Sequence, residues 1–428
     1  MSPLARRPAE RRFPSGAEGS QAFPVKILHV VPRIPYPADS GGTLRGLQLL
    51  RALDDAFEVT VLAPDLPGGD AAGLRAGLRG RVITAREPGG PQAVLAELGG
   101  VVRGRPMRYA QYGGRNLRAC FRHLLSEQTV DLVHFDHLHA AQLLPDAREL
   151  APRARTVMDA HNVEAQVAER LADVSPWPLS AVLRWQAAAI ARLETRTVRG
   201  LDAVLSCSEL DAAALRRAGA REVHLVPNGV ELRELPRARA PRDTVAFVGS
   251  YDWRPNADAA VVLAREIWPR VRQACPGLRL AIIGRNPPPA VQELAADDVE
   301  VTGRVDDVAP WLQRSFATAM PLRAGSGTRL KVLEAAAARV PIVATRLASE
   351  GLPFRDGVHL LHAESHEEFV TALLRVRREP GLAARLTEAA SEVAQEYDWR
   401  RIGSRLVELY RAWSSGEPAL PRALSSAG

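Results

Sequence analysis

The sequence predicts an α/β protein with two Rossmann-like domains, each a parallel β-sheet covered by helices. Short β-branched runs alternate with helical patterns along nearly the whole chain, and this alternation is typical of sheets built from βαβ units. The alternation restarts once, because a polar stretch rich in Arg and Pro at 231–243 separates two similar strand–helix series. A chain of 428 residues has room for two such domains, each with its own hydrophobic core.

Strands are expected wherever a short apolar run ends at a turn signal. The intervening segments carry apolar residues at helical spacing, as Leu263, Ile267 and Val271 do. The predicted organisation is a leader at 1–24, a first domain at 25–229 and a second domain at 230–398. The strand runs are 25–31, 57–63, 80–85, 130–136, 155–160, 201–206 and 222–227, then 244–249, 278–284, 299–302, 316–321, 341–345 and 358–362.

Composition limits the class of protein. No apolar run approaches the roughly 18 residues of a membrane span, and no segment of signal-peptide type follows the arginines of the leader. The three cysteines, Cys120, Cys207 and Cys275, are far apart and match no metal-binding spacing. These features predict a cytoplasmic protein without a disulfide framework. The Pro- and Arg-rich leader is expected to be disordered, and the 415–428 tail to be flexible.

The net charge of +7 comes almost entirely from arginine, since only two of the 56 basic residues, Lys26 and Lys331, are lysines. The charge is dispersed and not interleaved with aromatic residues, so nucleic acid is not an expected partner. Attraction to anionic lipid or to a phosphorylated substrate is equally compatible with it. The segment 177–199 is amphipathic and contains Trp185 between basic residues. It is either an ordinary packed helix or a helix that contacts a membrane surface.

The strongest functional signal is the segment 325–335, in which a loop of small residues leads directly into a helix. Helix starts present unpaired backbone N–H groups and the positive end of the dipole, so they attract anions. Arg329 and Lys331 add positive charge, and Glu334 lies one turn beyond Lys331 on the same face. The segment therefore predicts a diphosphate site with a ribose beside it, although a capped surface helix with an ion pair is the alternative. The loop residues of this site are Gly325, Ser326, Gly327 and Thr328.

A pair of glycines opens a helix after the first predicted strand. Gly41 and Gly42 allow a substrate phosphate or hydroxyl to approach the backbone closely. A turn with Ser40 as the helix cap is equally consistent with this stretch.

Asp159 and His161 lie at the carboxyl end of a predicted strand, where α/β proteins place functional groups, and alternation puts both on one side. The alternative is that Asn162 simply caps the following helix. The nearby cluster at 134–139 contains three histidines and Asp136, which are possible metal ligands. No metal site is expected there, because its members straddle a strand end and point in different directions.

Two strand ends of the second half carry weaker signals. Arg254 follows the first strand of that half and is within reach of a bound phosphate, while Asn256 is either a site residue or a turn residue. Arg304 and Val305 follow a later strand, where backbone groups can meet a nucleobase.

Together these segments resemble the GT-B glycosyltransferases, specifically glycosyltransferase family four, and within it a PEP-CTERM-associated subgroup of bacterial exopolysaccharide synthesis. The resemblance implies a nucleotide-sugar donor in the second domain, an acceptor in the first, and a final helix at about 399–414 that crosses back to the first domain. It runs from about residue 25 to 412 and rests on the order of HVVPRIPYPADSGGTLR, DAHNVEAQVAERL, SCSELDAAALRRAGAREVHLVPNGVE, FVGSYDWRPNADA, GRNPPPAV, VEVTGRVDDVAPWL, PLRAGSGTRLKVLEAAAARVPIVAT and YDWRR.

The resemblance also implies roles for single residues. Glu334 matches the second Glu of the family's paired-Glu motif, which is expected to bind the donor ribose, whereas Ser326 stands at the position of the first Glu. Gly41 and Gly42 match the glycine-rich loop beside the donor diphosphate. His161 matches a cleft histidine near the transferred sugar.

Two departures from the family pattern concern charge and backbone. The usual Arg and Lys after the first strand of the second domain are absent, so Arg329, Lys331 and Arg254 are the expected substitutes. Arg339 stands where the subgroup usually has glycine, and nothing in the sequence explains this change.

The resemblance implies a retaining hexosyl-type glycosyltransferase that moves a sugar from a nucleotide-diphosphate sugar to a glycan or lipid-linked acceptor. Fixed Lys and Arg charges and helix-start amides are expected to act there in place of a metal cofactor. Peripheral contact with the inner face of the cytoplasmic membrane is compatible with this function. Two alternatives stay open. One is a nucleotide-sugar epimerase that uses His161 and Glu164 as acid and base, and the other is an inactive nucleotide-sugar-binding protein, which the serine at position 326 would suit.

Overall fold

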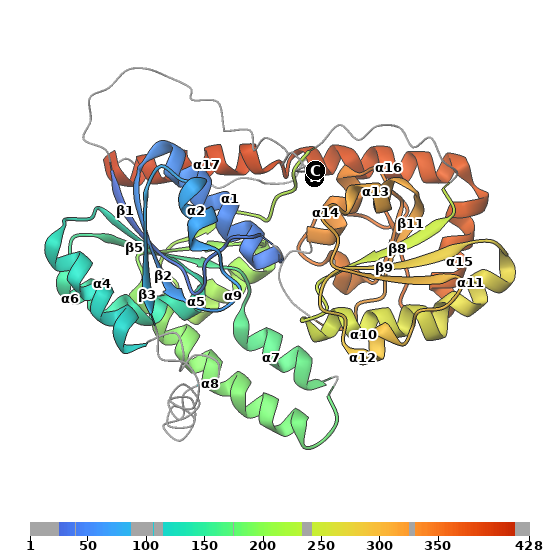
Figure 1. Ribbon diagram of the computed structural model, residues 1–428, viewed down its shortest axis with the longest axis horizontal. Coiled ribbons are helices and arrows are strands. Elements are labelled where there is room, and N and C mark those ends of the chain that lie inside the picture. Colours follow the sequence, from blue (N-terminus) through green and yellow to red (C-terminus); the bar gives the residue numbers. More distant parts are fainter. Residues whose placement is uncertain are drawn as a thin grey trace, which may run out of the picture.

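Two parallel β-sheets lie side by side, and helices cover them (Figure 1). The structure, a computed structural model, describes residues 25–38, 40–86, 106, 114–173, 175–232, 242–324 and 330–415. The two Rossmann-like domains predicted from the sequence are therefore present, one for each sheet.

The first sheet has seven parallel strands in the order β3-β2-β1-β4-β5-β6-β7. Its central strands are buried on both faces, which explains why they are continuous apolar runs and not alternating ones. The strands are β1 (Lys26–Val30), β2 (Glu58–Asp65), β3 (Arg81–Arg86), β4 (Leu132–Asp136), β5 (Arg155–Ala160), β6 (Ala203–Ser206) and β7 (Val223–Leu225).

The helices of the first half include a hairpin, formed by α7 and α8, that projects away from the sheet (Figure 1). These helices are α1 (Gly41–Ala56), α2 (Ala71–Ala76), α4 (Arg115–Glu127), α5 (His137–Ala140), α6 (Leu144–Leu150), α7 (Glu164–Asp173), α8 (Leu179–Gly200) and α9 (Glu209–Ala218), with a short 3₁₀ turn at Ala141–Leu143.

The second sheet has six parallel strands in the order β10-β9-β8-β11-β12-β13. Its strands are β8 (Thr244–Val248), β9 (Arg279–Ile283), β10 (Val299–Gly303), β11 (Ser315–Met320), β12 (Ile342–Ala344) and β13 (Leu361–His362). Its helices are α10 (Arg254–Val262), a π-helical turn at Leu263–Ile267, α11 (Trp268–Ala274), α12 (Pro289–Gln292), α13 (Ala309–Gln313), α14 (Leu330–Ala337), a 3₁₀ turn at Arg346–Ser349, α15 (His366–Arg378) and α16 (Pro380–Gln395).

Each of the thirteen strands predicted from apolar runs overlaps an observed strand. Within the described residues, no helix combines the length and the apolar character that crossing a membrane requires.

The last helix, α17 (Trp399–Ser415), packs on α1 of the first half. Its buried face belongs to the same hydrophobic cluster as Leu50 of α1 and Val61 of β2. Gly403 is required at the crossing, because a Cβ there would lie 2.8 Å from the Cβ of Ala52. The residues that α17 contributes to the cluster are Trp399, Ile402, Leu406, Leu409 and Tyr410.

The two described stretches that lead from one half to the other pair with each other. The Val230 N–H donates to the Tyr397 carbonyl at 2.7 Å, and the Trp399 N–H donates to the Val230 carbonyl at 3.3 Å. Gly229 precedes this pairing and has no space for a side chain, since a Cβ would lie 2.6 Å from Trp399. The crossing is therefore a short, closely packed junction.

Both sheets have a topological switch point, where the strand order changes direction. In the first sheet it lies between β1 and β4, and in the second between β8 and β11. Ligands of open parallel sheets bind beyond the carboxyl ends of the strands at such points. A ligand site is therefore expected in the segments that follow these four strands.

Candidate functional site

The glycine pair at the start of α1 lies between the two halves of the molecule. Ser40 caps the helix, since its side chain accepts the Thr43 N–H at 3.3 Å. A Cβ on Gly41 would lie 3.0 Å from Leu330 Cδ1, the first residue of α14, and a Cβ on Gly42 would lie 3.5 Å from His161 Nδ1. The helix-cap interpretation is therefore confirmed, whereas the approach of a substrate to Gly41 and Gly42 stays a prediction.

A buried ionic network stands behind these glycines. Arg45, one turn into α1 and 1% exposed, donates from Nε and Nη2 to the two carboxylate oxygens of Asp159 at 2.8 and 2.5 Å. Its Nη1 donates to Asn228 Oδ1 at 3.0 Å. A bidentate pair of this kind fixes the guanidinium plane relative to the carboxylate plane, because two guanidinium N–H groups each meet one carboxylate oxygen.

His161 completes the network at the ends of β4 and β5. Its Nε2 lies 2.6 Å from Asp136 Oδ1 and 3.2 Å from Asp159 Oδ2. The contact with Asp136 is an ion pair and not an aligned hydrogen bond, since neither atom has a hydrogen-bond partner of good geometry among the described residues. Asp159 and His161 thus lie on one side, as alternation along the strand predicts.

These charges change the protonation of His161. Burial alone would lower the pKa of His161, but Asp136 and Asp159 outweigh it and raise the pKa to about 9. The pKa of Asp159 is lowered, because Arg45 and His161 overcome the effect of its burial. At neutral pH the site therefore contains an imidazolium whose Nε2 faces carboxylates and whose Nδ1 faces Gly42.

The prediction that the members of the 134–139 cluster point in different directions is only partly right, because His134 lies apart whereas Nδ1 of His137 lies 2.8 Å from Nδ1 of His139. His134 Nδ1 lies 2.6 Å from the Tyr410 hydroxyl of α17. His137 has a φ of 79°, a strained value for a residue with a side chain, and its Nε2 lies 3.3 Å from Glu164 Oε1. Burial would raise the pKa of Glu164, but His137 and its neighbours lower it to about 2. Asn162 Nδ2 donates to this carboxylate at 3.3 Å, while the Glu164 N–H at the start of α7 donates to Glu194 Oε1 at 3.0 Å.

Three possible metal ligands do come together, in a combination that differs from this sequence cluster. Oxygens of Asp136 and Asp159 and a nitrogen of His161 lie within 4.8 Å of one another. Both oxygens of Asp159 already accept from Arg45, and that guanidinium would repel a cation at this point. The arrangement therefore fits an ion-pair network better than a metal centre.

In the second half, Lys331 is held at the start of α14. Its Nζ donates to Asn256 Oδ1 at 2.5 Å and lies 4.9 Å from the ring centroid of Phe247. Asn256 is fixed in turn, because its Nδ2 donates to the Ser250 carbonyl at 2.8 Å. Burial raises the pKa of Glu334, one turn further on, and Lys331 partly opposes that rise.

The remaining predicted residues occupy different positions. Arg254 begins α10 and is exposed, and its Nη1 donates to Ser175 Oγ of the first half at 3.2 Å. Arg304 is exposed just after β10, whereas Val305 packs against a small apolar cluster of the second half. The predictions for Gly325, Ser326, Gly327, Thr328 and Arg329 fall outside the described residues.

Arg45 and Asp136 were not among the site residues predicted from the sequence. A signal for Arg45 was present, because it occupies a core-facing position of α1, next to Gly46 and one turn after the glycine pair. A Cβ on Gly46 would lie 2.8 Å from Asp136 Oδ2, so this glycine makes room for the carboxylate.

The architecture is that of the GT-B glycosyltransferases, two Rossmann-like domains with a final helix returned to the first. Residues 40–234 match a family model described as Glycosyltransferase Family 4, and residues 242–379 match one described as Glycosyl transferases group 1. The two matches adjoin and cover both halves of the molecule.

The curated relatives that this chain resembles are also named as glycosyltransferases. The chain is 30% identical over 198 residues to a phosphatidyl-myo-inositol mannosyltransferase of Mycobacterium leprae, a match that covers 43% of this chain and 52% of the relative. It is 29% identical over 251 residues to a D-inositol 3-phosphate glycosyltransferase of Saccharomonospora viridis, with 51% and 57% coverage. The chain thus spans about half the length of these relatives.

Solved structures agree on the fold. Sucrose-phosphate synthase from Thermosynechococcus elongatus superposes with a TM-score of 0.70 at 18% identity, over 92% of this chain and 100% of that one. Anabaena HepE in complex with UDP and glucose gives a TM-score of 0.67 at 15% identity, over 91% and 100%.

Proposed function

We propose that this chain is a retaining glycosyltransferase that moves a hexosyl group from a nucleotide-diphosphate sugar to a glycan or lipid-linked acceptor. The observation that carries the proposal is the convergence of the two switch points. Gly41 of the first half lies next to the first residue of α14, the helix that bears Lys331 and Glu334, and Gly42 lies beside His161. The glycosyltransferase family matches on both halves support the same reaction class.

The donor would lie between the halves, with its diphosphate at the start of α14. Lys331 is positioned by Asn256 and supplies a fixed positive charge there. Glu334 would accept hydrogen bonds from the ribose hydroxyls. The Gly41–Gly42 start of α1 adds backbone N–H groups close to the same point.

His161 would contribute charge from the opposite side. As an imidazolium it donates from Nδ1 toward the space beside Gly42, while Asp136 and Asp159 hold Nε2. Negative charge develops on the nucleoside diphosphate as its bond to the anomeric carbon breaks. Preorganised cations and helix-start amides stabilise such charge in the transition state.

The transfer itself needs no nucleophile from the protein. In the proposed same-face reaction, the bond from C1 to the phosphate oxygen breaks and a bond from C1 to the acceptor oxygen forms. The acceptor proton passes to the departing phosphate oxygen. Because the fixed cations stabilise the leaving group, we propose that the reaction is independent of a metal ion.

We further propose a place in exopolysaccharide or cell-envelope glycan synthesis, in the PEP-CTERM-associated subgroup, at the inner face of the cytoplasmic membrane. The name of the mycobacterial relative includes a phosphatidyl-inositol, which supports a lipid-linked acceptor.

The test begins with thermal unfolding in the presence of a panel of nucleotide sugars. The cognate donor at about a hundred times its Kd should stabilise the protein by about 2.7 kcal/mol. Turnover with that donor should persist in excess chelator, and NMR of the product should show the same anomeric configuration as the donor. Failure of every nucleotide sugar to stabilise the chain would contradict the proposal, and inverted product would contradict its stereochemical part.

A further inference from the structure

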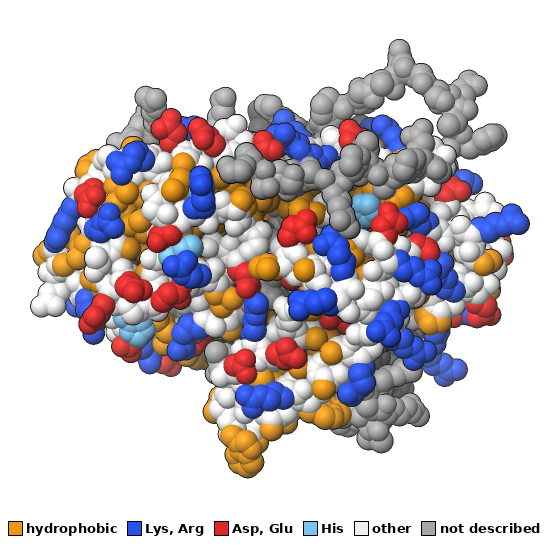
Figure 2. All heavy atoms as spheres, turned by 180° about the vertical axis from the view of Figure 1, so that it is seen from behind, with side chains coloured by type: hydrophobic (Ala, Val, Ile, Leu, Met, Phe, Trp, Pro, Cys, Tyr) orange, Lys and Arg blue, Asp and Glu red, His pale blue; other side chains and the backbone are white. Residues whose placement is uncertain are grey.

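The α7–α8 turn and the start of α8 carry a concentration of exposed hydrophobic side chains. Six large hydrophobic side chains of the described residues are exposed, and four of them lie here. Figures 1 and 2 show that this turn forms a projection whose tip is hydrophobic. The four are Trp177 at 82% exposed, Val182 at 49%, Trp185 at 44% and Leu179 at 40%.

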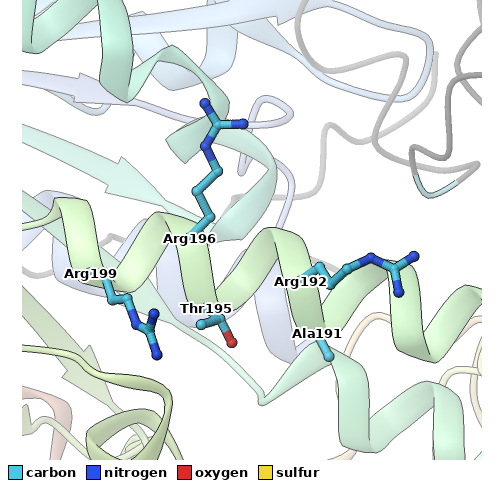
Figure 3. A pocket seen from close by; sticks show the side chains of 5 residues that line it. All are labelled: Ala191, Arg192, Thr195, Arg196 and Arg199. Carbon is cyan, nitrogen blue, oxygen red and sulfur yellow. The ribbon is translucent and has the colours of Figure 1, made fainter.

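The same face of α8 continues as a row of arginines. Arg192, Arg196 and Arg199 follow Trp185 at spacings of seven, four and three residues, which place all four on one side of a helix. They line a surface hollow and fan out from successive turns (Figure 3). No ion pair joins these arginines to a carboxylate in the part of the chain that the structure describes.

Two acidic side chains of the hairpin, Glu194 and Asp173, are turned inward or already paired. Glu194 points inward, is 5% exposed and accepts the Glu164 N–H at 3.0 Å. Asp173 contacts Arg184 at 3.4 Å. The face therefore combines an apolar end with a positive stripe, and the two lie on one continuous surface.

We propose that this surface, formed by the α7–α8 turn and the exposed face of α8, docks the protein on an anionic phospholipid bilayer. Trp177 and Trp185 enter the interfacial region, where amphipathic indole rings are favoured. Arg192, Arg196 and Arg199 lie along the negatively charged headgroups, which attract each cation near the surface. A helix with one apolar end and arginines on the same face is typical of interfacial binding.

A bilayer fits this surface better than a second copy of the chain does. In a two-fold symmetric dimer the same patch meets itself, so the arginine row of one copy would oppose arginines of the other. An anionic bilayer supplies a complementary charge over the whole row and an apolar layer for the tip.

Docking would also place the proposed donor site with respect to the membrane. Side chains of the hairpin bond to the second half: Arg170 of α7 forms a forked pair with Glu350 at 2.6 and 3.1 Å, and Ser175 accepts from Arg254. Docking would bring the protein to a lipid-linked acceptor, and this part of the inference rests on the proposed function. Vesicle binding requires no turnover, so the two ideas can fail separately.

The test is flotation of the full chain with vesicles of phosphatidylcholine, with and without phosphatidylglycerol. The wild-type chain should float with the anionic vesicles. The double variant Trp177→Ser/Trp185→Ser should bind at least about ten-fold more weakly, because burial of two indole rings is lost. Arg192→Gln and Arg196→Gln should each weaken binding by about five-fold, the value of one charge near an anionic surface.

Matched controls remove the same groups elsewhere. Leu210→Ser removes an exposed hydrophobic residue of α9, and Arg265→Gln/Arg400→Gln removes two exposed charges from other helices. Both controls should float like wild type. Because the substituted side chains are exposed, all variants should unfold at the wild-type temperature.

Three results would overturn the assignment. Equal flotation of the wild type and the tryptophan double variant would show that the hydrophobic tip does not contact the bilayer. Equal flotation with neutral and anionic vesicles would show that the arginine row does not bind the headgroups. A wild-type chain that ignores vesicles but forms a dimer lost in Trp177→Ser/Trp185→Ser would assign the surface to self-association.

Discussion

At the scale of single residues, Lys331 has the clearest expected effect. Its ammonium is held by Asn256 at 2.5 Å, so it sits at the start of α14 without having to be ordered by the ligand. We predict that Lys331→Ala lowers kcat by about 10²-fold or more, as loss of a preorganised electrostatic group usually does. Steady-state kinetics with the cognate donor measure the effect.

The chain offers a matched control for this prediction. Lys26→Ala removes the only other lysine, which begins β1. It should leave kcat unchanged. Near-normal turnover of Lys331→Ala would remove this residue from the mechanism.

Asp136 controls the charge of His161 in the same site. It lies 2.6 Å from His161 Nε2 and is the main cause of the pKa rise to about 9. In Asp136→Asn the imidazolium should lose its proton at a lower pH, so the alkaline limb of the kcat/KM profile should move toward acid. Asp297→Asn, at an exposed position in the second half, should leave the profile in place. An unmoved limb in Asp136→Asn would mean that His161 does not act as a cation.

At the scale of elements, the end of α14 shows why glycine is usual at the position that Arg339 occupies in this chain. The Arg339 N–H donates to the Ala336 carbonyl and the Val340 N–H to the Ala335 carbonyl, each at 3.0 Å. These two bonds form a Schellman motif, and Arg339 has the left-handed φ of 54° that the motif demands. Glycine adopts this conformation without the clash that a Cβ causes, which accounts for the glycine of the resembling subgroup.

We therefore predict that Arg339→Gly stabilises the protein by about 1 kcal/mol, the usual cost of a left-handed non-glycine residue. Thermal or urea unfolding measures it. Arg385→Gly, in the exposed middle of α16, should instead destabilise by about 1 kcal/mol. Destabilisation by Arg339→Gly would show that the arginine side chain makes a contact worth more than the backbone strain.

The elements were the part of the molecule that the sequence predicted best. The strands are short buried runs bounded by turn residues, and that pattern is local, so all thirteen were located. The network of Arg45, Asp136 and His161 was only half predicted, because three separate elements bring these side chains together. His161 was identified through its position at a strand end, but a buried arginine in an amphipathic helix gives no local sign of its partner.

At the scale of the whole molecule, α17 joins the end of the chain to the base of the site. The Tyr410 hydroxyl contacts His134 Nδ1 at 2.6 Å, and His134 stacks on His29 with ring centroids 4.2 Å apart. Both histidines lie next to the ionic network of Asp159 and His161. The stability of the first half therefore depends on the last helix and on pH.

His29 provides the last prediction. Neither of its ring nitrogens has a hydrogen-bond partner among the described residues, and burial lowers its pKa from 6.5 to about 3. Burial also lowers the pKa of His134 to about 4. The unfolded chain then binds protons that the folded chain does not, so both residues add stability above pH 6.5 that is lost as the pH falls toward the folded values.

Two other groups act with the opposite sign, so the test must compare variants. His161, with its pKa raised to about 9, adds stability that is present below pH 6.5 and lost as the pH rises through 9. Glu194, with its pKa raised by burial to about 7, adds stability at low pH that is lost between about 4.5 and 7. The free energy of unfolding of the wild type alone therefore depends on pH through the sum of all these effects.

The comparison is between wild type and His29→Leu, which removes one buried base from the stack. The free energy of unfolding of the wild type should fall more steeply than that of the variant between pH 6 and 4, by up to about 1.4 kcal/mol per pH unit for one proton. His123→Leu, at an exposed position of α4, should preserve the wild-type slope. Parallel curves for wild type and His29→Leu would mean that His29 is already protonated in the folded protein, and the stack with His134 would then need a buried counter-charge.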